Sequence, residues 1–423
     1  MKLSAVLPIL LLSVGALMCG CASQTPSPLM LRWGAEVLIS DEDNAAALSA
    51  LISNGTAVVG NTVHLVWASA PTQASADVYY KRSDDGGRAW SQATRLTFAG
   101  ADASEATVAA RDQNVYVVWR DKRYFADGSI FFKRSLDNGK TWDADVLLSP
   151  NNVRSAAPTL ALDGDTIYVA WEHYDLGPGN TRLRKSVDGG ATWQDPVDVT
   201  REQTAKGGGG CPSLSVGAGH QLNLVHCSLK DAGETRNYNW ELYFKQSSDG
   251  GKTWSDSLRL TDDRIGDSRF PTTAASGGYL HMVWFDDRDD TKYKHVGYPP
   301  LAPEPDHNFE VYYKRTTDGG KTWTNDVRLT TADGVAISPS IAVAGNNVYV
   351  VWQDNRDGND EIYFKHSNDN GTRWSDDIRL TNQRAASKFP SLAVDAAGNV
   401  YVIWTDKSSG KMEIYFRKGE VAR

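Results

Sequence analysis

Six copies of one eight-residue pattern constrain this chain more than any other feature of its sequence. The pattern is Ser/Thr-x-Asp-x-Gly-x-x-Trp, and its copies occupy residues 83–90, 135–142, 186–193, 247–254, 316–323 and 367–374. Their third positions are Asp85, Asp137, Asp188, Asp249, Asp318 and Asp369. Regular self-similarity at this spacing is typical of a structural unit that recurs side by side. The chain is therefore predicted to form one repeat domain.

The same short strands surround each copy. An alternating run such as DVYYKR (77–82) precedes the pattern, and an apolar strand that ends in Trp, such as VYVVW (115–119), lies further upstream. A short strand that ends in RLT, LLS or DVT follows the pattern. Period-2 alternation of β-branched and aromatic residues, broken by Gly, Asn and Asp, predicts antiparallel hairpins. Each unit is thus predicted to be four strands, A to D, which is the content of a β-propeller blade.

The number of blades follows from strand B. Its pattern occurs seven times, ending at Trp67, Trp119, Trp171, His226, Trp284, Trp352 and Trp404. The last unit stops after strand C (412–418), whereas residues 32–40 resemble an isolated strand D. We predict an all-β, seven-bladed propeller in which residues 32–40 complete the last blade, because closure removes two exposed sheet edges. A six-bladed ring is the alternative.

The repeated pattern resembles the Asp box of the sialidases, and the chain is similar to the sialidase-like BNR/Asp-box repeat propeller family. The resemblance covers all six boxes and the strands around them. It implies a propeller fold and, for a sialidase, hydrolysis of terminal sialic acid with three arginines, a Tyr–Glu nucleophile pair and an Asp acid/base. Typical sialidases have six blades, so seven would be a departure.

The boxes themselves are assigned a structural role. Six copies around a ring cannot share one central active site. Their hydroxyl and carboxylate groups can accept hydrogen bonds from turn amides, and their Gly permits a positive φ. Their position on the C–D hairpins puts the B–C and D–A connections on the opposite face, which we call the loop face. The long connections at 228–240 and 286–309 lie there, so we predict the functional site on this face.

A Trp-x-Asp-x-Arg motif follows strand B in three units. It places Asp121, Asp286 and Asp354, and with them Arg123, Arg288 and Arg356, at equivalent points of the loop face. One interpretation, which the repetition itself favours, is an Asp–Arg brace of the B–C loop. The other is a cluster of guanidinium groups for the carboxylate of an anionic sugar.

Two further sets of residues are candidates for a catalytic site. Arg269-Phe270-Pro271 lies where sialidases carry an Arg-Ile-Pro motif, so the resemblance implies that Arg269 is the first arginine of a triad. Unit three departs from its siblings with WEHYD (171–175), and the spacing of Glu172 and Tyr174 directs both side chains to one side of an extended strand. They are the candidate Tyr–Glu pair. The three motif aspartates compete for the acid role.

Cys211 and Cys227 are the two cysteines in the body of the protein. The repeat puts them at the start and the end of neighbouring antiparallel strands, where a disulfide is geometrically feasible in an oxidising compartment. Two free buried thiols are the alternative.

The N-terminus resembles an export signal. Lys2 precedes a nearly continuous apolar run (3–18), and LMCGCAS (17–23) resembles a bacterial lipoprotein box with Cys21 as the lipidated residue. Simple cleavage and release is the alternative. We expect a signal peptide (1–20), a lipid attachment and tether (21–31), and one propeller domain (32–419) that faces the periplasm or the exterior. In a Gram-negative envelope, Ala22 after the lipid site would suit the outer membrane.

Charge and composition limit the partners. The formal net charge is −8, which excludes nucleic acid as the expected partner because phosphates need a basic face. The histidines show no metal-ligand spacing, so no metal and no cofactor are expected. Calcium in the acidic loops 286–290 and 354–361 is a minor alternative, since arginines interrupt their carboxylates. The expected partner is a carbohydrate or protein on the loop face, with the membrane reached only through the lipid and the protein monomeric.

Two functions from different classes fit these features. One is an exo-acting, sialidase-like glycoside hydrolase of the cell envelope. The other is a non-catalytic propeller that binds glycan or protein or assists assembly, because propeller folds serve many functions. A geometric criterion separates them: a sialidase-like site would need Arg269 and at least two of the three motif arginines to converge near the axis.

Overall fold

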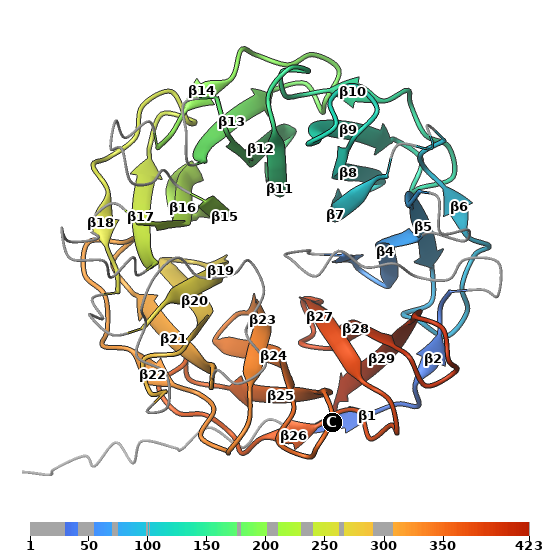
Figure 1. Ribbon diagram of the computed structural model, residues 1–423, viewed down its shortest axis with the longest axis vertical. Helices are drawn as coiled ribbons and strands as arrows, with labels where there is room; N and C mark the ends of the chain where they lie inside the picture. The colour runs from blue at the N-terminus through green and yellow to red at the C-terminus, as the bar shows by residue number, and fades with distance from the viewer. Residues whose placement is uncertain are drawn as a thin grey trace, which may run out of the picture.

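The protein is a closed ring of seven antiparallel sheets (Figure 1). The computed structural model describes residues 30–40, 55–69, 75–98, 100, 102–175, 179–200, 210–229, 240–261, 266–290 and 308–422. Strand A of each blade lies nearest the central axis, and the opposite edge of the blade lies at the periphery. The predicted seven-bladed propeller is confirmed, and the six-bladed alternative is wrong. No helix in the described part of the chain is long and apolar enough to cross a membrane.

Six blades follow one another along the chain, each with strands A to D in order. Blade one contains β3 (Thr56–Val59), β4 (Thr62–Ser69), β5 (Asp77–Ser83) and β6 (Thr94–Arg95). Blade two contains β7 (Ser104–Arg111), β8 (Asn114–Asp121), β9 (Ser129–Ser135) and β10 (Val146–Leu147). Blade three contains β11 (Ser155–Asp163), β12 (Thr166–His173), β13 (Asn180–Ser186) and β14 (Val197–Asp198).

The next three blades have the same order. Blade four contains β15 (Gly210–Gly217), the short 3₁₀ turn η1 (Ala218–His220), β16 (Gln221–Ser228), β17 (Glu241–Ser247) and β18 (Leu258–Arg259). Blade five contains β19 (Ser268–Ser276), β20 (Tyr279–Asp286), β21 (Glu310–Thr316) and β22 (Val327–Arg328). Blade six contains β23 (Ala336–Ala344), β24 (Asn347–Asp354), β25 (Glu361–Ser367) and β26 (Ile378–Arg379).

Blade seven joins the two ends of the chain. Its strands A to C are β27 (Ser387–Val394), β28 (Val400–Asp406) and β29 (Glu413–Val421), and its outer edge is β1 (Leu31–Trp33) with β2 (Val37–Leu38). Trp33 pairs with Gly419, and Leu38 pairs with Tyr415. Ser40 Oγ accepts a hydrogen bond from the Ile414 amide at 3.0 Å. The predicted closure of the ring by the N-terminal segment is confirmed.

The Asp boxes shape the C–D turns. In the first box, Ser83 Oγ donates to Asp85 Oδ1 at 2.7 Å and accepts from the Gly87 amide at 2.7 Å. The same carboxylate oxygen accepts from the Ala89 amide at 2.9 Å. The same Ser/Thr–Asp hydrogen bond recurs at Asp137, Asp188, Asp249, Asp318 and Asp369. These bonds satisfy amides of the C–D turns.

Each box also fastens its blade to the preceding one. Trp142 meets the edge of Tyr80, with ring centroids 4.9 Å apart and planes at 75°. The box glycine Gly139 has φ 78°, and a Cβ there would collide with the Tyr80 ring. Equivalent aromatic contacts join Trp193 to Phe132, Trp323 to Phe244, Trp374 to Tyr313 and Trp90 to Phe416, and Trp254 packs in the same cluster as Leu183. Trp33 of β1 completes the ring against Phe364, with centroids 5.0 Å apart.

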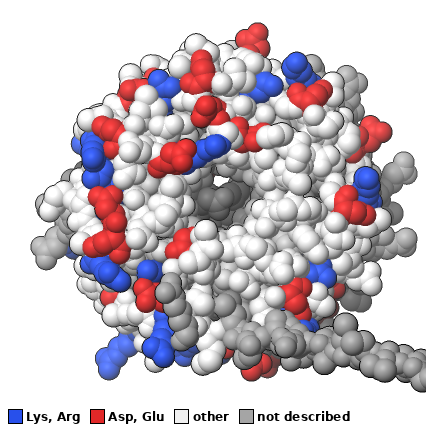
Figure 2. Space-filling view, turned by 180° about the vertical axis from the view of Figure 1, so that it is seen from behind, with Lys and Arg blue, Asp and Glu red and all other residues white. Residues whose placement is uncertain are grey.

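A second set of contacts bridges the blades nearer the middle of strand C. The Lys133 ammonium donates to the Leu96 carbonyl of the preceding blade at 2.8 Å. Equivalent bonds run from Lys81 to Ile39, from Arg184 to Leu148, from Lys314 to Leu260, from Lys365 to Leu329 and from Arg417 to Leu380. Because these Lys and Arg side chains bind carbonyl groups between the blades, they do not form a basic surface. On the face shown in Figure 2, Lys and Arg side chains are interspersed with Asp and Glu side chains.

Two blades carry a buried histidine in place of a common tyrosine. His64 Nδ1 is 2.7 Å from the Tyr80 hydroxyl, and His281 Nδ1 is 2.7 Å from the Tyr313 hydroxyl. Where strand B has Tyr at this position, its diagonal neighbour on strand C, two residues before the register partner, is Phe132, Phe364, Phe416 or, in blade three, Leu183. A hydroxyl is thus present on strand C where the strand B imidazole needs a hydrogen-bond partner.

Replacing Trp33 with Ala tests the closure of the ring. The substitution removes the Trp33–Phe364 contact, so we expect the free energy of unfolding to fall by about 2–4 kcal/mol, as for other large-to-small changes in a packed site. Urea unfolding followed by tryptophan fluorescence measures this loss. Trp142→Ala, inside the ring, is the matched control and should cost a similar amount. An unchanged unfolding midpoint for Trp33→Ala would contradict closure by β1.

Acid should destabilise the protein through the two buried histidines. Burial, followed by the charges of Arg82 and Arg315 respectively, lowers the pKa of His64 and of His281 to about 4. The unfolded chain, with a histidine pKa of about 6.5, then binds more protons between pH 6.5 and 4. The contribution of each neutral, buried histidine to the free energy of unfolding should therefore be fully present above pH 6.5. It should fall by up to about 3 kcal/mol per histidine as the pH drops from 6.5 to 4.

His281→Asn is the variant that isolates this effect, because Asn223 already occupies the same strand position in blade four. Thermal unfolding between pH 7.5 and 4 should show a shallower acid loss for this variant than for the wild type. His220→Asn, at an exposed histidine, is the control and should follow the wild-type curve. Identical curves for all three proteins would refute the assignment.

Candidate functional site

The inner edge of the loop face is a ring of β-bulges. Strand A of blades two to seven begins there, and each shows a register shift against strand B near its start. Each bulge holds one non-glycine residue with φ between 48° and 54°, namely Glu105, Ala157, Cys211, Phe270, Ser338 and Phe389. Bulges re-aim side chains and backbone groups. Six equivalent bulges therefore direct their amides in similar ways around the axis.

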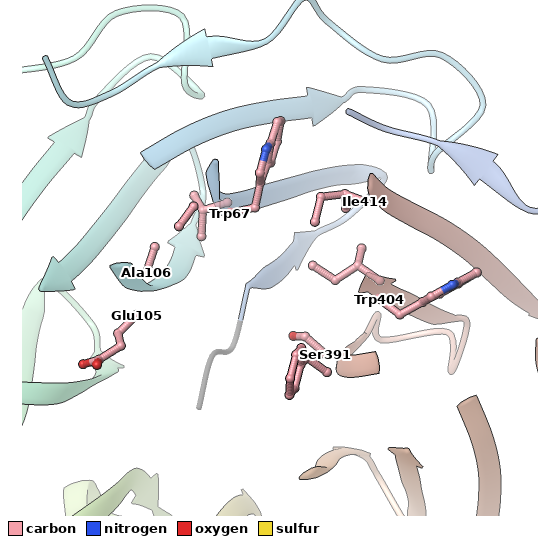
Figure 3. Close-up of a pocket in the computed structure, with 10 residues that line it drawn as sticks. Trp67, Glu105, Ala106, Ser391, Trp404 and Ile414 are labelled. Carbon is pink, nitrogen blue, oxygen red and sulfur yellow. The ribbon is translucent and has the colours of Figure 1, made fainter. Parts of the chain in front are cut away.

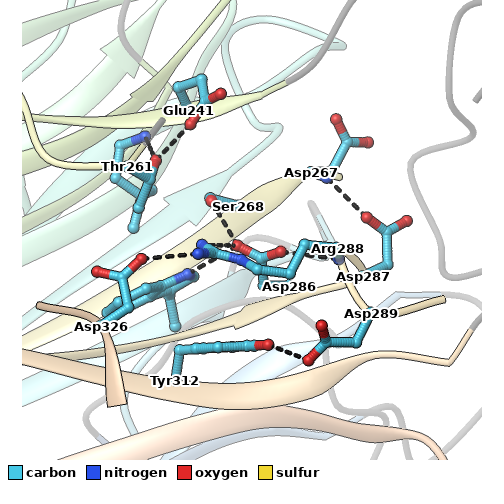
Figure 4. Close-up of polar contacts among 12 residues, drawn as sticks. Glu241, Thr261, Asp267, Ser268, Asp286, Asp287, Arg288, Asp289, Tyr312 and Asp326 are labelled. Carbon is cyan, nitrogen blue, oxygen red and sulfur yellow. Dashed lines mark hydrogen bonds and ion pairs between the residues drawn. The ribbon is translucent and has the colours of Figure 1, made fainter. Parts of the chain in front are cut away.

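The three arginines of the Trp-x-Asp-x-Arg motif are held inside their own blades. Arg288 donates to Asp286 at 2.6 Å and to Asp326 at 2.7 Å, and its guanidinium lies 4.5 Å from the Tyr312 ring centroid (Figure 4). Burial alone would lower the pKa of Arg288, but the hydrogen bonds and charges of the two carboxylates outweigh it and raise the pKa. Arg123 makes the same contacts with Asp121 and Asp145. Arg356 makes them with Asp354 and Asp377.

These arginines point away from the axis. Asp326 immediately precedes the peripheral strand β22, so the Arg288 guanidinium is drawn toward the outer edge of its blade. Asp286 is buried and also accepts from Trp284 Nε1 at 3.0 Å and from Ser268 Oγ at 2.6 Å. The three guanidinium groups do not converge, and the cluster expected for an anionic sugar is not formed. Arg123, Arg288 and Arg356 brace the B–C loops, and Asp121, Asp286 and Asp354 are their buried partners.

Arg269 occupies the start of strand A, as the sequence predicts, but it is ion-paired within blade five. Its guanidinium donates to Asp267, which is fully buried, and only 8% of Arg269 is exposed. The second oxygen of Asp267 accepts from the Trp240 amide at 2.7 Å. Arg269 is therefore ion-paired with a carboxylate of its own blade, and this carboxylate is not one of those that bind the three bracing arginines.

Blade three brings the predicted Tyr–Glu pair together. The Tyr174 hydroxyl donates to Glu172 Oε2 at 2.6 Å. Glu172 is buried, and its Oε1 accepts the Cys211 amide at the bulge of blade four. Tyr174 is half-buried, and a Cβ at Gly179 would approach its ring at 3.0 Å, so glycine leaves room for the ring. The pair lies at the junction of blades three and four.

Arg154 completes this site and was missed by sequence reasoning. Its guanidinium lies 4.4 Å from the centroid of the Tyr174 ring, and its carbonyl accepts the Tyr174 amide at 3.1 Å. Arg154 Nε is buried without a hydrogen bond to any described residue. The signal was present: the residue before strand A is Val335 in blade six and Ala386 in blade seven, so a cation there departs from the repeat.

The surroundings keep the Tyr174 phenol protonated. Burial, then the charge of Glu172 and the hydrogen bond to it, raises the pKa of Tyr174 far above its usual value, although Arg154 acts in the opposite direction. The phenol is thus neutral near pH 7, and Glu172 is the acceptor for its proton. This arrangement can transfer a proton from oxygen to carboxylate as the phenol oxygen forms a new bond.

The bridge from Glu172 to the next blade is part of a wider pattern. Glu105 Oε2 accepts the Ala157 amide at 2.7 Å, and Gln353 Oε1 accepts the Phe389 amide at 3.3 Å. Glu105 also binds Arg120 at 3.0 Å, and burial is the main cause that raises its pKa. Bridging a bulge amide is therefore an architectural role. Blade three differs because the second carboxylate oxygen of Glu172 accepts a hydrogen bond from the Tyr174 hydroxyl.

Cys211 and Cys227 are thiols in the structure, and they lie next to each other in blade four. Cys227 belongs to the buried cluster of blades four and five, and Cys211 packs against that cluster. No group of three or more His, Cys, Asp or Glu side chains in the described residues is arranged to hold a metal ion. The lipid attachment at Cys21 and the signal peptide lie outside the described residues.

A separate pocket opens between blades seven, one and two (Figure 3). It encloses about 450 Å³ of space, open solvent included. Its lining consists of Val66, Trp67, Ala68, Glu105, Ala106, Phe389, Ser391, Ile403, Trp404 and Ile414. None of the site residues predicted from the sequence lines this pocket.

Comparisons with known proteins agree with the propeller fold. A family model described as a BNR repeat-like domain matches residues 180–418, more than half of the chain. Similar solved structures include a Hadza microbial sialidase (17% identity, 84% of this chain and 73% of the other, TM-score 0.52). Another is a polysaccharide lyase, the PL25 ulvan lyase bound to -[GlcA(1-4)Rha3S]- (13% identity, 88% and 93%, TM-score 0.62).

A third similar structure is a protein of unknown function from Dyadobacter fermentans (16% identity, 76% of this chain and 95% of the other, TM-score 0.53). At these identities the likeness shows the fold alone. No match was found among curated proteins.

The brace in blade five can be tested by Asp286→Asn. The substitution removes one of the two carboxylates that pair with the buried Arg288 and leaves only Asp326, so we expect the free energy of unfolding to fall by about 3 kcal/mol. Urea unfolding measures this loss. Asp289→Asn, at a more exposed carboxylate of the same loop, is the control and should cost about 1 kcal/mol or less. Equal stability of Asp286→Asn and wild type would argue against a bracing role.

Proposed function

Because the chain belongs to the family of BNR repeat-like domains, we propose that it acts on glycans through the loop face of its propeller. The site is the junction of blades three and four. The observation that carries this proposal is the 2.6 Å hydrogen bond from Tyr174 to Glu172, with the Arg154 guanidinium over the tyrosine ring. These three groups combine a proton donor, a proton acceptor and a cation within one small region.

The ligand that suits this site carries a carboxylate. Arg154 makes no ion pair with the residues that the structure describes, whereas Arg269 and the bracing arginines are all paired with aspartates. A guanidinium binds a carboxylate in a bidentate, charge-assisted manner. Two proteins of similar fold are named for related ligands, since one is a sialidase and the other was bound to a saccharide that contains GlcA. We therefore expect a terminal acidic sugar.

The finer proposal is hydrolysis of a terminal sialic acid. In that reaction, the Tyr174 oxygen would form a bond to the anomeric carbon while the glycosidic carbon–oxygen bond breaks. Glu172 would take the phenolic proton in the same step. A neutral phenol suits an anionic sugar better than a carboxylate nucleophile, which the substrate would repel. An aryl leaving group departs as a stabilised phenolate, so an aryl sialoside tests this step without a separate acid.

A non-catalytic glycan-binding propeller is the second candidate. The observation in its favour is that Arg123, Arg288 and Arg356 are neutralised in separate blades, so the arginine triad of a sialidase is not assembled from them. Under this proposal, Arg154 and the Tyr174 hydroxyl would bind the sugar without breaking a bond. For either function we propose export and a lipid anchor at Cys21.

Three substitutions at the site separate these functions. Tyr174→Phe removes the nucleophilic oxygen, and turnover of a fluorogenic aryl sialoside should fall at least about 100-fold while sugar binding weakens little. Glu172→Gln should also abolish turnover but keep the fold, because Gln353 bridges the same position in blade six. Arg154→Met should weaken binding of an acidic sugar about 10- to 100-fold and leave binding of its neutral analogue unchanged.

The controls are Tyr124→Phe, an exposed tyrosine of the blade-two loop, and Arg88→Met on the box face. Both should behave as wild type in turnover and in calorimetric titration with the sugar. Binding of acidic sugars without turnover would select the non-catalytic function. If the folded protein neither binds nor cleaves acidic glycans, the proposal of glycan action at this site fails.

A further inference from the structure

We propose that Cys211 and Cys227 close a disulfide in the mature protein and that this bond fixes the backbone amide on which Glu172 rests. The disulfide is inferred from the geometry of blade four alone. Only its consequence for the Glu172–Tyr174 pair rests on the proposed function.

The pairing of β15 and β16 places the two cysteines side by side. Gly210 is the direct partner of Cys227, and Cys211 is the next residue along β15. Directly opposed residues such as Gly210 and Cys227 have Cα atoms about 4.5–5.5 Å apart, so Cys211, one residue further along β15, is a close neighbour of Cys227. Both side chains belong to the same buried environment between blades four and five.

The bulge supplies the correct direction. In a regular strand, Cys211 would point to the face of the sheet opposite to that of Gly210 and Cys227. The register shifts between Gly210 and Ser213, and Cys211 has φ 49°, so the chain turns at this residue. Its thiol then lies against Cys227, and this contact, followed by burial, raises the pKa of Cys211. The positive φ of Cys211 thus directs its thiol toward Cys227, which a regular strand conformation would not do.

Closure of the bond is a two-electron oxidation. The two thiols lose their hydrogens as protons and give two electrons to an external disulfide, which is reduced to two thiols. A thiol–disulfide oxidoreductase of an oxidising compartment is the chemical class that supplies this acceptor. Cys227 is only 1% exposed, so this exchange would take place before blade four packs against blade five.

The consequence reaches the site through two hydrogen bonds. The Cys211 amide donates to Glu172 Oε1, and Glu172 Oε2 accepts the Tyr174 hydroxyl. A disulfide anchors the bulge to β16 and therefore limits the motion of the amide that orients the carboxylate. Its removal leaves the amide in place but frees the bulge to move.

Mass spectrometry of the exported protein tests the bond directly. Trypsin releases both cysteines in one peptide, residues 207–230, because no Lys or Arg lies between them. After alkylation without reductant, we expect this peptide to carry no alkyl group and to be lighter by two hydrogen atoms than the dithiol peptide. Prior reduction should allow both cysteines to be alkylated. Alkylation of both cysteines without reductant would overturn the proposal.

Thermal unfolding tests the effect on the fold. Closing a loop of this length should raise the Tm by roughly 3–4 °C, so reductant should lower the wild-type Tm by about that amount. Cys211→Ala should show the lower Tm with and without reductant. This variant should fold, because Ala157 occupies the equivalent bulge of blade three with φ 49°.

Cys211→Ala is also the control for thiols elsewhere in the chain, because any reductant-dependent shift that it retains would come from a cysteine outside this pair. A wild-type Tm that is the same with and without reductant would also overturn the proposal. Neither readout uses a sugar, so loss of the glycan function leaves this test intact.

Discussion

The contact of a box tryptophan with a side chain of the preceding blade is the interaction on which the whole ring depends. A single four-stranded sheet cannot bury both of its faces, so each blade needs two neighbours. The contact is close because the box glycine presents no Cβ to the ring beside it, as Gly139 does for Tyr80. The same contact closes the ring, where Trp33 of the first strand meets Phe364 of blade six. The N-terminal segment thus carries the tryptophan of a box whose other residues it lacks.

The repeat made the fold predictable, because the same strand and turn patterns recur in each blade. Six boxes, seven B strands and one isolated D strand leave few ways to close a ring. Internal substitutions agree with this pairing, since strand C carries Tyr80 where strand B carries His64, and Phe132 where strand B carries Tyr116. Such paired changes are readable once strands are aligned. The bounds of the domain, expected at 32 and 419, differ by only a few residues from the outer strand ends at Leu31 and Val421.

The candidate site was less predictable, because strand spacing fixes the face of a residue but not the direction of a long side chain. Arg288 lies on the loop face as expected, yet Asp326, 38 residues later, draws its guanidinium outward. Asp326 lies at the outer edge of the blade, and the Trp-x-Asp-x-Arg motif contains no residue that predicts this contact. Glu172 and Tyr174 were found because they are short-range neighbours on one strand. Arg154 reaches the same ring from the D–A connection of its blade, which a motif confined to strand B does not contain.

The contrast between repeated and unrepeated residues explains where chemistry can arise in this ring. A bulge amide points toward the neighbouring blade, and Glu105, Glu172 and Gln353 accept it at three junctions. The accepting group needs only one oxygen for this purpose. A carboxylate has a second, and in blade three that oxygen meets a phenol instead of the arginine found beside Glu105. The hydrogen bond to the bulge amide therefore orients the Glu172 carboxylate at the inner edge of the loop face. The tyrosine two residues later, Tyr174, gives that carboxylate a proton to accept.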